Sequence, residues 1–229
     1  MNLMILRKQL KNLRSGEKMK SVIVAHGYSS KDALKKEIED ADLIICSDGG
    51  AIYLMEEGYL PNVIIGDLDS INRDAYEYFV EKGVKIITYP REKDFSDTEL
   101  CIDYALSLGA NNICIISGIG SRIDHSLINI SLLYKILKRG AYGYIATDSA
   151  YIYLCNKVLE ITGNEGDVIS LVPLTFKVSG INTKGLKYSL EDGTIYLGQS
   201  IGVSNEIINE KCSIEIKEGL LVVVKQNIL

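Results

Sequence analysis

Acidic side chains follow four apolar runs of this sequence, each at the point where the run ends. A buried run can be followed by carboxylates only where the chain emerges into a cleft that offers a positive partner. Because so many acids in one place would repel one another, a cation is expected among them. The residues that follow "LIIC", "VIIG", "IITYP" and "ICIISGIG" are Asp48, then Asp67 and Asp69, then Asp94 and Asp97, and finally Asp124.

The pattern favours Mg²⁺ over a transition metal. Mg²⁺ takes oxygen ligands and leaves positions for water and for substrate phosphates. The only histidines, His26 and His125, form no spacing with cysteine that fits a zinc site. Lys93 and Arg122 lie in the same stretches and are natural phosphate contacts, Arg122 being able to bind two oxygens at once. The chemistry predicted is therefore Mg²⁺-dependent work on a phosphate-bearing ligand.

The elements expected between Ser21 and about Asp148 would gather these acids together. Uninterrupted apolar runs alternate with helical stretches such as "DTELCIDYALSLG", which predicts a parallel sheet covered on both faces. In such open α/β sheets, ligands collect outside the carboxyl ends of the strands. The loops after the strands should therefore open on one edge.

After about Ala150 the helical period disappears. Short runs such as "DVISLVPL", "GLKYSL" and "GTIYLG", punctuated by Gly, Asn and Asp, predict a small antiparallel β-sandwich or barrel. Met19 begins "MKSVIVAHG", which is typical of a natural protein start. The expected divisions are an extension of unassigned role (1–18), an open, mostly parallel α/β domain (19–149) and an antiparallel β-sandwich (150–229).

The composition indicates a globular protein without a nucleic-acid or membrane partner. The chain has 229 residues, of which 47% are hydrophobic, and a formal net charge of -5, so it has no basic surplus to neutralise phosphates. No apolar stretch approaches the roughly 20 residues that span a bilayer. The five cysteines are scattered without a CxxC pair, which is typical of reduced core thiols in a cytoplasmic protein.

Each motif also has a purely structural interpretation. The "DLDS" segment could cap the following helix through Asp69 or Ser70, and "SDGG" could be a plain turn with glycines at positive φ. Ser96 and Glu99 form a capping box, and His125 taken alone fits a structural histidine. The functional interpretation therefore depends on several loops coming together.

Taken in order, the motifs resemble those of the thiamine pyrophosphokinase family. They cover most of Ser21 to Val224, and although each is weak alone, together they are highly specific. The matching segments are "SDGGA" (47–51), "PNVIIGDLDSI" (61–71), "EKDFSDTEL" (92–100), "GIGSRIDHSLINI" (118–130), "GLKYSL" (185–190) and "GVSNE" (202–206).

The resemblance implies an ATP-binding α/β domain followed by a thiamine-binding β-sandwich. It also implies a homodimer, with thiamine between the domains of one subunit and the partner chain. The implied reaction is attack of the thiamine hydroxyl on the β-phosphorus of ATP, which gives thiamine diphosphate and AMP with the help of Mg²⁺.

The resemblance further implies roles for individual residues. The Mg²⁺ ligands would be Asp67, Asp69 and Asp97. Either Asp94 or Asp97 could accept the hydroxyl proton. The catalytic set is then Asp67, Asp69, Asp94, Asp97 and Arg122; the ATP contacts are Asp48, Gly49, Lys93, Thr98 and Arg122; and the thiamine contacts are Asp124, Asn129, Ser204 and Asn205.

The sequence departs from the family pattern at several positions. Phe95 and Ser96 stand where a Lys or other polar residue and a Thr are common, and Ser121 replaces a usual Gly. The chain also has no tryptophan, which animal and fungal members place near thiamine. These departures concern the thiamine contacts more than the metal site, and they indicate a member of bacterial type.

Four other functions fit part of the pattern. "DLDS" could be the nucleophile loop of a haloacid-dehalogenase-like, Mg²⁺-dependent phosphatase, although that loop normally follows the first strand. The DxD pair could serve a nucleotide-sugar transferase, but "SDTEL" and "SRIDH" would then have no purpose. A related pyrophosphokinase could act on a pterin alcohol. A non-catalytic sensor would not need the metal-binding acids, so catalysis is favoured.

Overall fold

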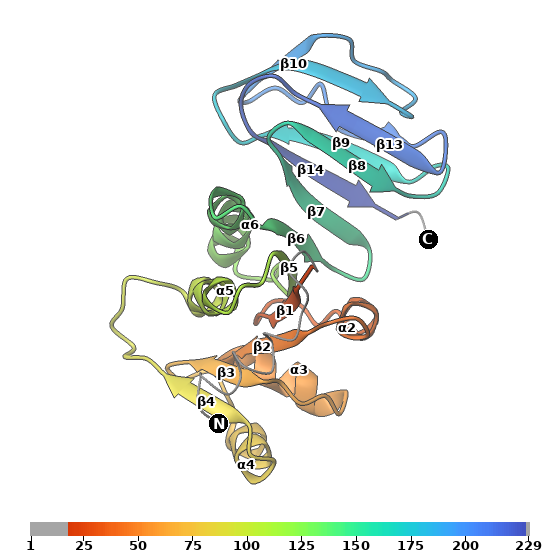
Figure 1. Ribbon diagram of the computed structural model, residues 1–229. Coiled ribbons are helices and arrows are strands. Elements are labelled where there is room, and N and C mark those ends of the chain that lie inside the picture. The colour runs from red at the N-terminus through yellow and green to blue at the C-terminus, as the bar shows by residue number, and fades with distance from the viewer. Residues whose placement is uncertain (1–17, 228–229) are drawn as a thin grey trace. The chain divides into compact units, whose positions relative to one another are not determined.

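The chain divides into two compact units, and the boundary falls between Asp148 and Ser149. The structure is a computed structural model that describes residues 18–227 (Figure 1). Of the expected N-terminal extension, therefore, all but Lys18 lies outside the described residues. Each unit is described by itself below.

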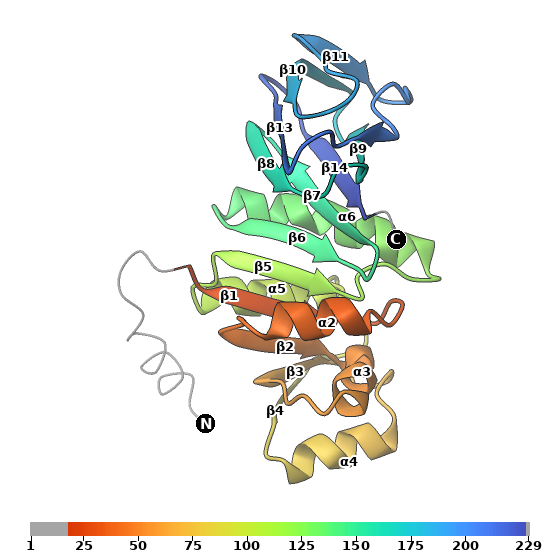
Figure 2. The ribbon, with the colours of Figure 1, turned by 90° about the vertical axis from the view of Figure 1, so that its right-hand side faces the viewer.

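The first unit is an open α/β structure, as the sequence predicts. Its strands are mutually parallel and lie in the order β6-β5-β1-β2-β3-β4. In Figure 2, α2 and α3 cover one face of this sheet while α5 and α6 cover the other. The strands are β1 (Lys20–Val24), β2 (Leu43–Ser47), β3 (Val63–Gly66), β4 (Lys85–Thr88), β5 (Asn112–Ile116) and β6 (Tyr142–Ala146), and the helices are α2 (Lys31–Ile38), the short 3₁₀ helix η1 (Asp48–Gly50), α3 (Ala51–Glu56), α4 (Arg73–Glu81), α5 (Asp97–Ser107) and α6 (Ile123–Lys138).

The order in which strands are added to the sheet reverses between β1 and β5, although these two neighbouring strands are parallel. The strands run outward from β1 to β4, and the chain then returns to the other side of β1 for β5 and β6. The connections that leave β1 and β5 toward opposite faces of a sheet leave a crevice between them, where open α/β folds bind ligands. Fold topology thus places the candidate site at the carboxyl ends of β1 and β5.

The loops after β1 and β5 lie backbone against backbone at this crevice. The N–H of Gly27 donates to the carbonyl of Ser117 at 2.7 Å, and the N–H of Tyr28 donates to that of Ile119 at 2.7 Å. A Cβ added to Gly27 would lie 2.3 Å from the carbonyl oxygens of Ser117 and Ile119. Only glycine allows this close approach.

The residues that cap α5 and α4 test the structural interpretations of the "SDTEL" and "DLDS" motifs. Ser96 caps α5 by accepting a hydrogen bond from the Glu99 N–H at 3.2 Å, as the capping box predicts. Helix α4 is capped by Asn72, whose Oδ1 accepts from the Ala75 N–H at 2.8 Å. The structural interpretation of "DLDS" as the cap of α4 is therefore wrong, because the helix begins only at Arg73, directly after Asn72.

The second unit is the expected antiparallel β-sandwich. Within this unit one layer of strands has the order β12-β9-β14-β7, and the other layer has the order β11-β10-β13-β8. Alternate residues of β8 and β13 are buried, and they meet those of β9 and β14 in one apolar core that includes Leu159, Leu171, Ile214 and Val223. The strands are β7 (Ala150–Cys155), β8 (Val158–Thr162), β9 (Val168–Pro173), β10 (Lys177–Lys184), β11 (Gly193–Tyr196), β12 (Asn205–Glu206), β13 (Lys211–Glu215) and β14 (Leu221–Gln226).

The "GLKYSL" segment does not form the strand-like run expected of it. Gly185 turns the chain with a φ of +74°, and within the segment only Leu186 forms an isolated bridge, to Ile207. The following residues are held by a side chain instead, because Asn205 accepts from the Tyr188 N–H at 3.0 Å and donates to the Tyr188 carbonyl at 2.7 Å.

The cysteines are buried and free, as the sequence predicts for core thiols. Within residues 18–227, no helix has both the length and the apolar character that crossing a membrane requires.

Candidate active site

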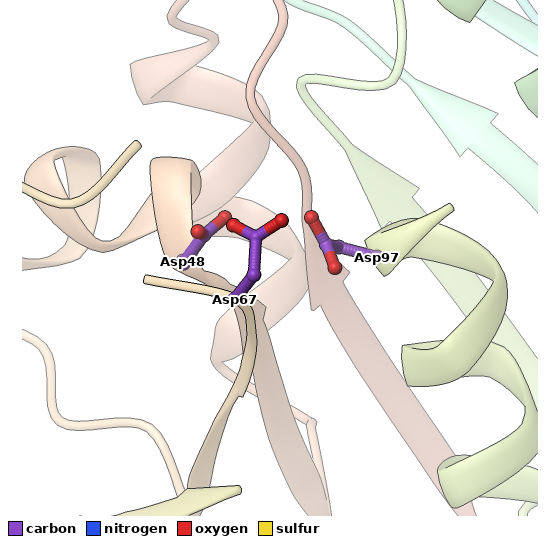
Figure 3. Close-up of side chains that lie close together, drawn as sticks. All are labelled: Asp48, Asp67 and Asp97. Carbon is purple, nitrogen blue, oxygen red and sulfur yellow. The ribbon is translucent and has the colours of Figure 1, made fainter. Parts of the chain in front are cut away.

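Three carboxylates from separate elements converge at the carboxyl edge of the first sheet. Asp48 belongs to η1 directly after β2, Asp67 follows β3, and Asp97 is the first residue of α5. One oxygen from each lies within 4.8 Å of the others, and Figure 3 shows the three groups pointing toward one another. The expectation that loops after different strands would bring acids together is met by these three residues.

Glycines make room for this convergence. A Cβ on Gly66 would lie 2.7 Å from Cγ of Asp48, so that a larger residue at the end of β3 would displace the carboxylate. Gly49 and Gly50 do not serve a positive φ, contrary to the structural interpretation of "SDGG". A side chain on Gly49 would instead meet the His26 ring at 2.1 Å, and one on Gly50 would meet the Val24 carbonyl oxygen at 2.5 Å.

Gly66→Ala is expected to lower Mg²⁺-dependent turnover by about tenfold or more, because a small displacement of the Asp48 carboxylate from the other two acids is costly. The melting temperature should also fall, because the added methyl group would lie 2.7 Å from Cγ and 2.9 Å from Cβ of the short, buried Asp48 side chain. Gly193→Ala in β11 is the matched control, as its added Cβ would lie at an ordinary 3.4 Å from Leu190. Steady-state kinetics and thermal unfolding check both variants, and unchanged turnover in Gly66→Ala would contradict the role given to Gly66.

Burial and the charges of neighbouring carboxylates raise the pKa of two of the three carboxyl groups. Burial raises the pKa of Asp48, and the charge of Asp97 raises it further. Burial also raises the pKa of Asp97, against the opposing effect of Lys93. For Asp67, hydrogen bonds from the Asp69 N–H and from Lys93 outweigh the effect of burial and lower the pKa. The first two carboxylates are therefore less stable as anions than they would be in water.

A hard divalent cation fits this group of oxygens. Oδ1 of Asp97 is buried and accepts no hydrogen bond, although it lies 3.2 Å from the Lys93 ammonium group. A buried carboxylate oxygen without a hydrogen bond is costly unless a cation meets it, and for Asp97 the Lys93 ammonium group is that cation in this structure. The three carboxylate oxygens within 4.8 Å of one another could also be met by one divalent ion. Mg²⁺ prefers carboxylate oxygens in small number and keeps its other positions for water and phosphate. The residues present therefore suit Mg²⁺.

The three carboxylates adjoin a pocket of about 330 Å³ at the β1–β5 crevice. Asp48 and Asp97 are part of its wall, together with residues from the loops that follow β1, β3 and β5. Its volume lies at the lower end of the range for small-ligand sites, which starts near 300 Å³. Polar side chains make up much of the wall, among them Ser47, Ser70, Ser96, Thr98, Ser121, Arg122, His125 and Asn129.

Arg122, at the wall of this pocket, forms an exposed pair with Asp124, which is not one of the residues that line it. The Arg122 guanidinium donates to both carboxylate oxygens of Asp124, at 2.6 and 3.3 Å, and it thereby lowers the pKa of Asp124. Both side chains are about two-thirds exposed. The guanidinium is thus held in place but remains open to an anionic ligand.

Comparison with known proteins identifies the family. A model of the thiamin pyrophosphokinase catalytic domain matches residues 34–145, and a model of the thiamin pyrophosphokinase vitamin B1 binding domain matches residues 156–221. The chain belongs to the thiamine pyrophosphokinase family. It is accordingly an enzyme of the thiamine diphosphokinase type.

Individual relatives agree with this assignment. Thiamine pyrophosphokinase of Bacillus subtilis is 29% identical over 189 residues, which cover 82% of this chain and 88% of that protein. Thiamine pyrophosphokinase 1 of Arabidopsis thaliana is 28% identical, with 80% and 78% covered. The crystal structure of the Bacillus subtilis protein superimposes with a TM-score of 0.84 at 28% identity, and the match covers 92% of this chain and all of that one.

The residues matched to the thiamine pyrophosphokinase pattern fall into a central and a peripheral group. Asp48, Asp97, Thr98, Arg122 and Asn129 line the pocket. Asp67 and Lys93 join them by contact, since Nζ of Lys93 lies 3.2 Å from Asp67 Oδ2. Gly49 adjoins them, because its N–H donates to Asp48 Oδ1 at 2.7 Å.

Asp69 and Asp94 lie at the periphery. The Asp69 carboxylate lies 3.3 Å from Arg91 and accepts from the Ser70 hydroxyl at 3.0 Å. It does not belong to the group of three found among the described residues, where Asp48 stands in its place. Asp94 is exposed and is not one of the residues that line the pocket.

The residues that the family pattern assigns to thiamine differ in the hydrogen bonds that they already make within the protein. Asn129 is buried, and its amide donates to the Gly118 carbonyl at 2.7 Å. Asn205, in the second unit, uses its amide to hold the backbone of Tyr188. Ser204 has a φ of +60°, and its N–H donates to the Ser170 hydroxyl at 3.1 Å. Such a conformation is uncommon for a residue other than glycine and often marks a functional loop.

Sequence reasoning missed the loop after β1. His26, Gly27 and Tyr28 line the pocket, as does His125, for which a structural role had seemed the simpler interpretation. The signal was present, because "HGY" follows the apolar run "SVIVA" in the same way that the acids follow theirs. It was overlooked because this loop contains no carboxylate.

Proposed function

We propose that this enzyme transfers a pyrophosphoryl group from Mg²⁺-bound ATP to the hydroxyl of thiamine, giving thiamine diphosphate and AMP. The observation that supports this most strongly is the convergence of Asp48, Asp67 and Asp97 beside a pocket at the β1–β5 crevice. Mg²⁺ bound there would offset negative charge on the phosphate oxygens. We keep Asp69 in the proposed set as a neighbour of Asp67 that could join the ligands by leaving Arg91.

The chain's own residues would bind and orient the phosphates. Lys93 supplies positive charge beside Asp67 and Asp97, and Arg122 supplies it at the pocket wall, where it can bind two oxygens at once. Gly49 lies within η1, which follows β2, and Thr98 is the second residue of α5, where backbone N–H groups at the helix start favour anions. Alignment of the two substrates and stabilisation of the transferred charge would account for most of the rate.

The hydroxyl proton of thiamine needs an acceptor near the carboxylates. Of the two candidates, Asp97 lines the pocket and has a raised pKa, whereas Asp94 is exposed and lies outside the lining. Asp97 is therefore the better-placed proton acceptor. We assign thiamine to Asp124, Asn129, Ser204 and Asn205, and we propose that the enzyme works in the cytoplasm as a homodimer with active sites at the subunit interface.

Product analysis tests the proposal. Purified protein is incubated with ATP, Mg²⁺ and thiamine, and the products are identified by ³¹P NMR and chromatography. AMP with thiamine diphosphate is the expected outcome. ADP with thiamine monophosphate would indicate a different kinase, and orthophosphate alone would indicate a phosphatase.

A pterin alcohol is the second candidate acceptor, because the acids at the first sheet do not by themselves distinguish one alcohol from another. The match of residues 156–221 to a vitamin B1 binding domain favours thiamine. Replacing thiamine by a pterin alcohol in the same assay should therefore give no AMP.

A further inference from the structure

We propose that the ammonium group of Lys93 takes the place of the divalent cation while no nucleotide is bound, so that the metal enters together with the nucleotide rather than before it. This inference rests on the proposed function. It concerns a second role for Lys93, which must bind the carboxylates first and the phosphates later.

The first support is the position of the ammonium group. Lys93 lies between β4 and α5, and its Nζ is 3.2 Å from Asp67 Oδ2 and 3.2 Å from Asp97 Oδ1. Its side chain is only 13% exposed. These are two of the three carboxylates that face one another within 4.8 Å. The lysine thus provides, from within the chain, the positive charge that this group of acids requires.

The second support is the way in which Asp48 is held. Its oxygens accept hydrogen bonds from the backbone N–H groups of Gly49 at 2.7 Å and of Ser70 at 3.4 Å. These bonds do not depend on Lys93. When the lysine leaves, Asp48 therefore keeps its position, and only the oxygens of Asp67 and Asp97 have to change partner.

Charge then determines the order of binding. A divalent cation that entered while Lys93 was in place would compete for Asp67 and Asp97 and would be repelled by the ammonium group. The four-carbon stem of lysine lets the ammonium group swing away, provided that another acceptor is offered. Nucleotide phosphates are such an acceptor. The nucleotide and the metal should therefore each strengthen the binding of the other, since such coupling is reciprocal.

The simpler alternative is that Lys93 only forms a structural ion pair and contacts phosphate, without hindering the metal. The two views differ in the sign of one effect. If Lys93 competes with the metal, removing its charge should tighten metal binding in the absence of nucleotide. If it does not compete, removing it should leave metal binding unchanged or weaken it.

The experiment measures Mn²⁺ binding by electron paramagnetic resonance of free Mn²⁺, with and without α,β-methylene-ATP, which resists cleavage between its α- and β-phosphorus atoms. In wild-type protein without nucleotide, Mn²⁺ should bind weakly, and the analogue should strengthen its binding. In Lys93→Met, Mn²⁺ should bind about tenfold or more tightly without nucleotide, because a unit charge next to two ligands has been removed. The strengthening by the analogue should shrink accordingly.

Lys135→Met is the matched control. Lys135 also bridges two acids, Glu99 and Asp103 of α5, at 2.8 and 2.6 Å, but it is not part of the pocket wall. Its replacement should leave Mn²⁺ affinity unchanged. If Mn²⁺ bound more tightly to both variants by the same factor, the change in net charge alone would explain the effect, and the inference would be overturned.

The remaining outcomes separate the inference from the proposed function. If Lys93→Met and the more polar Lys93→Gln, both folded by circular dichroism, bind Mn²⁺ no more tightly than wild type while the analogue still promotes binding to wild type, the Lys93 inference fails and the metal site stands. If wild-type protein with the analogue binds no more Mn²⁺ than Asp97→Asn does, the metal site itself fails.

Discussion

Asp97→Asn is expected to lower the turnover number by about 10²-fold or more, equivalent to about 3 kcal/mol of transition-state stabilisation. Asp97 lines the pocket, shares the group of three carboxylates and has a buried oxygen that accepts no hydrogen bond. The amide has nearly the same shape but no charge, so it would be a poor ligand for Mg²⁺ and no proton acceptor. Steady-state kinetics with ATP, Mg²⁺ and thiamine measure the effect.

The same substitution should not destabilise the fold. Burial raises the pKa of Asp97, so the carboxylate is less favourable in the folded protein than in the unfolded chain. Stability is therefore lost as the pH rises from the usual carboxyl pKa through the raised value. At pH 7 the amide removes this cost, and the melting temperature of the metal-free variant should equal or exceed that of wild type.

Asp103→Asn provides the control for Asp97→Asn. Asp103 lies on the same helix, α5, but pairs with Lys135 and is not among the pocket-lining residues. Its turnover should remain near that of wild type. Near-normal Mg²⁺-dependent turnover in Asp97→Asn would defeat the assignment of Asp97.

Arg122→Ala is expected to lower kcat/KM for ATP by about 10²-fold, because a preorganised positive group next to transferred phosphate is lost. Arg122→Lys should recover only part of this loss, since an ammonium group cannot bind two phosphate oxygens in the planar arrangement of a guanidinium. Varying the ATP concentration at saturating thiamine measures both variants.

Arg139→Ala is the control for the arginine variants. Arg139 is exposed at the other end of α6, and its replacement by alanine removes the same charge as Arg122→Ala does. Its kcat/KM should stay near the wild-type value. If Arg122→Lys were as active as wild type, a point charge would suffice and the two-oxygen contact would be wrong.

The fold of both units could be predicted because their hydrophobic patterns are distinct. Continuous apolar runs between amphipathic helices specified the parallel sheet, and the loss of that period near Ala150 marked the sandwich. The "GLKYSL" segment was misjudged because its alternating pattern resembles a strand. In the structure the Asn205 side chain takes the backbone hydrogen bonds of Tyr188 that a neighbouring strand would otherwise provide. Such long-range contacts cannot be seen in a local pattern.

The sequence predicted where the site lies more accurately than which acidic residues belong to it. The strand-end rule brought Asp48, Asp67 and Asp97 to one edge, but it could not separate Asp67 from Asp69, which share a loop. The difference depends on Leu68, whose φ of +66° turns the chain between the two acids. A positive φ at leucine is uncommon and has no local sequence signal. The pairing of Asp69 with Arg91 is equally a product of the folded loop.

The central claim is that Asp48, Asp67 and Asp97 together bind one divalent ion that also contacts the phosphates of ATP. Anomalous diffraction from crystals grown with Mn²⁺ and α,β-methylene-ATP tests it most directly. The account predicts one manganese peak within coordination distance of all three carboxylates and of the nucleotide phosphates. A manganese peak bound to the phosphates but remote from these carboxylates would contradict it.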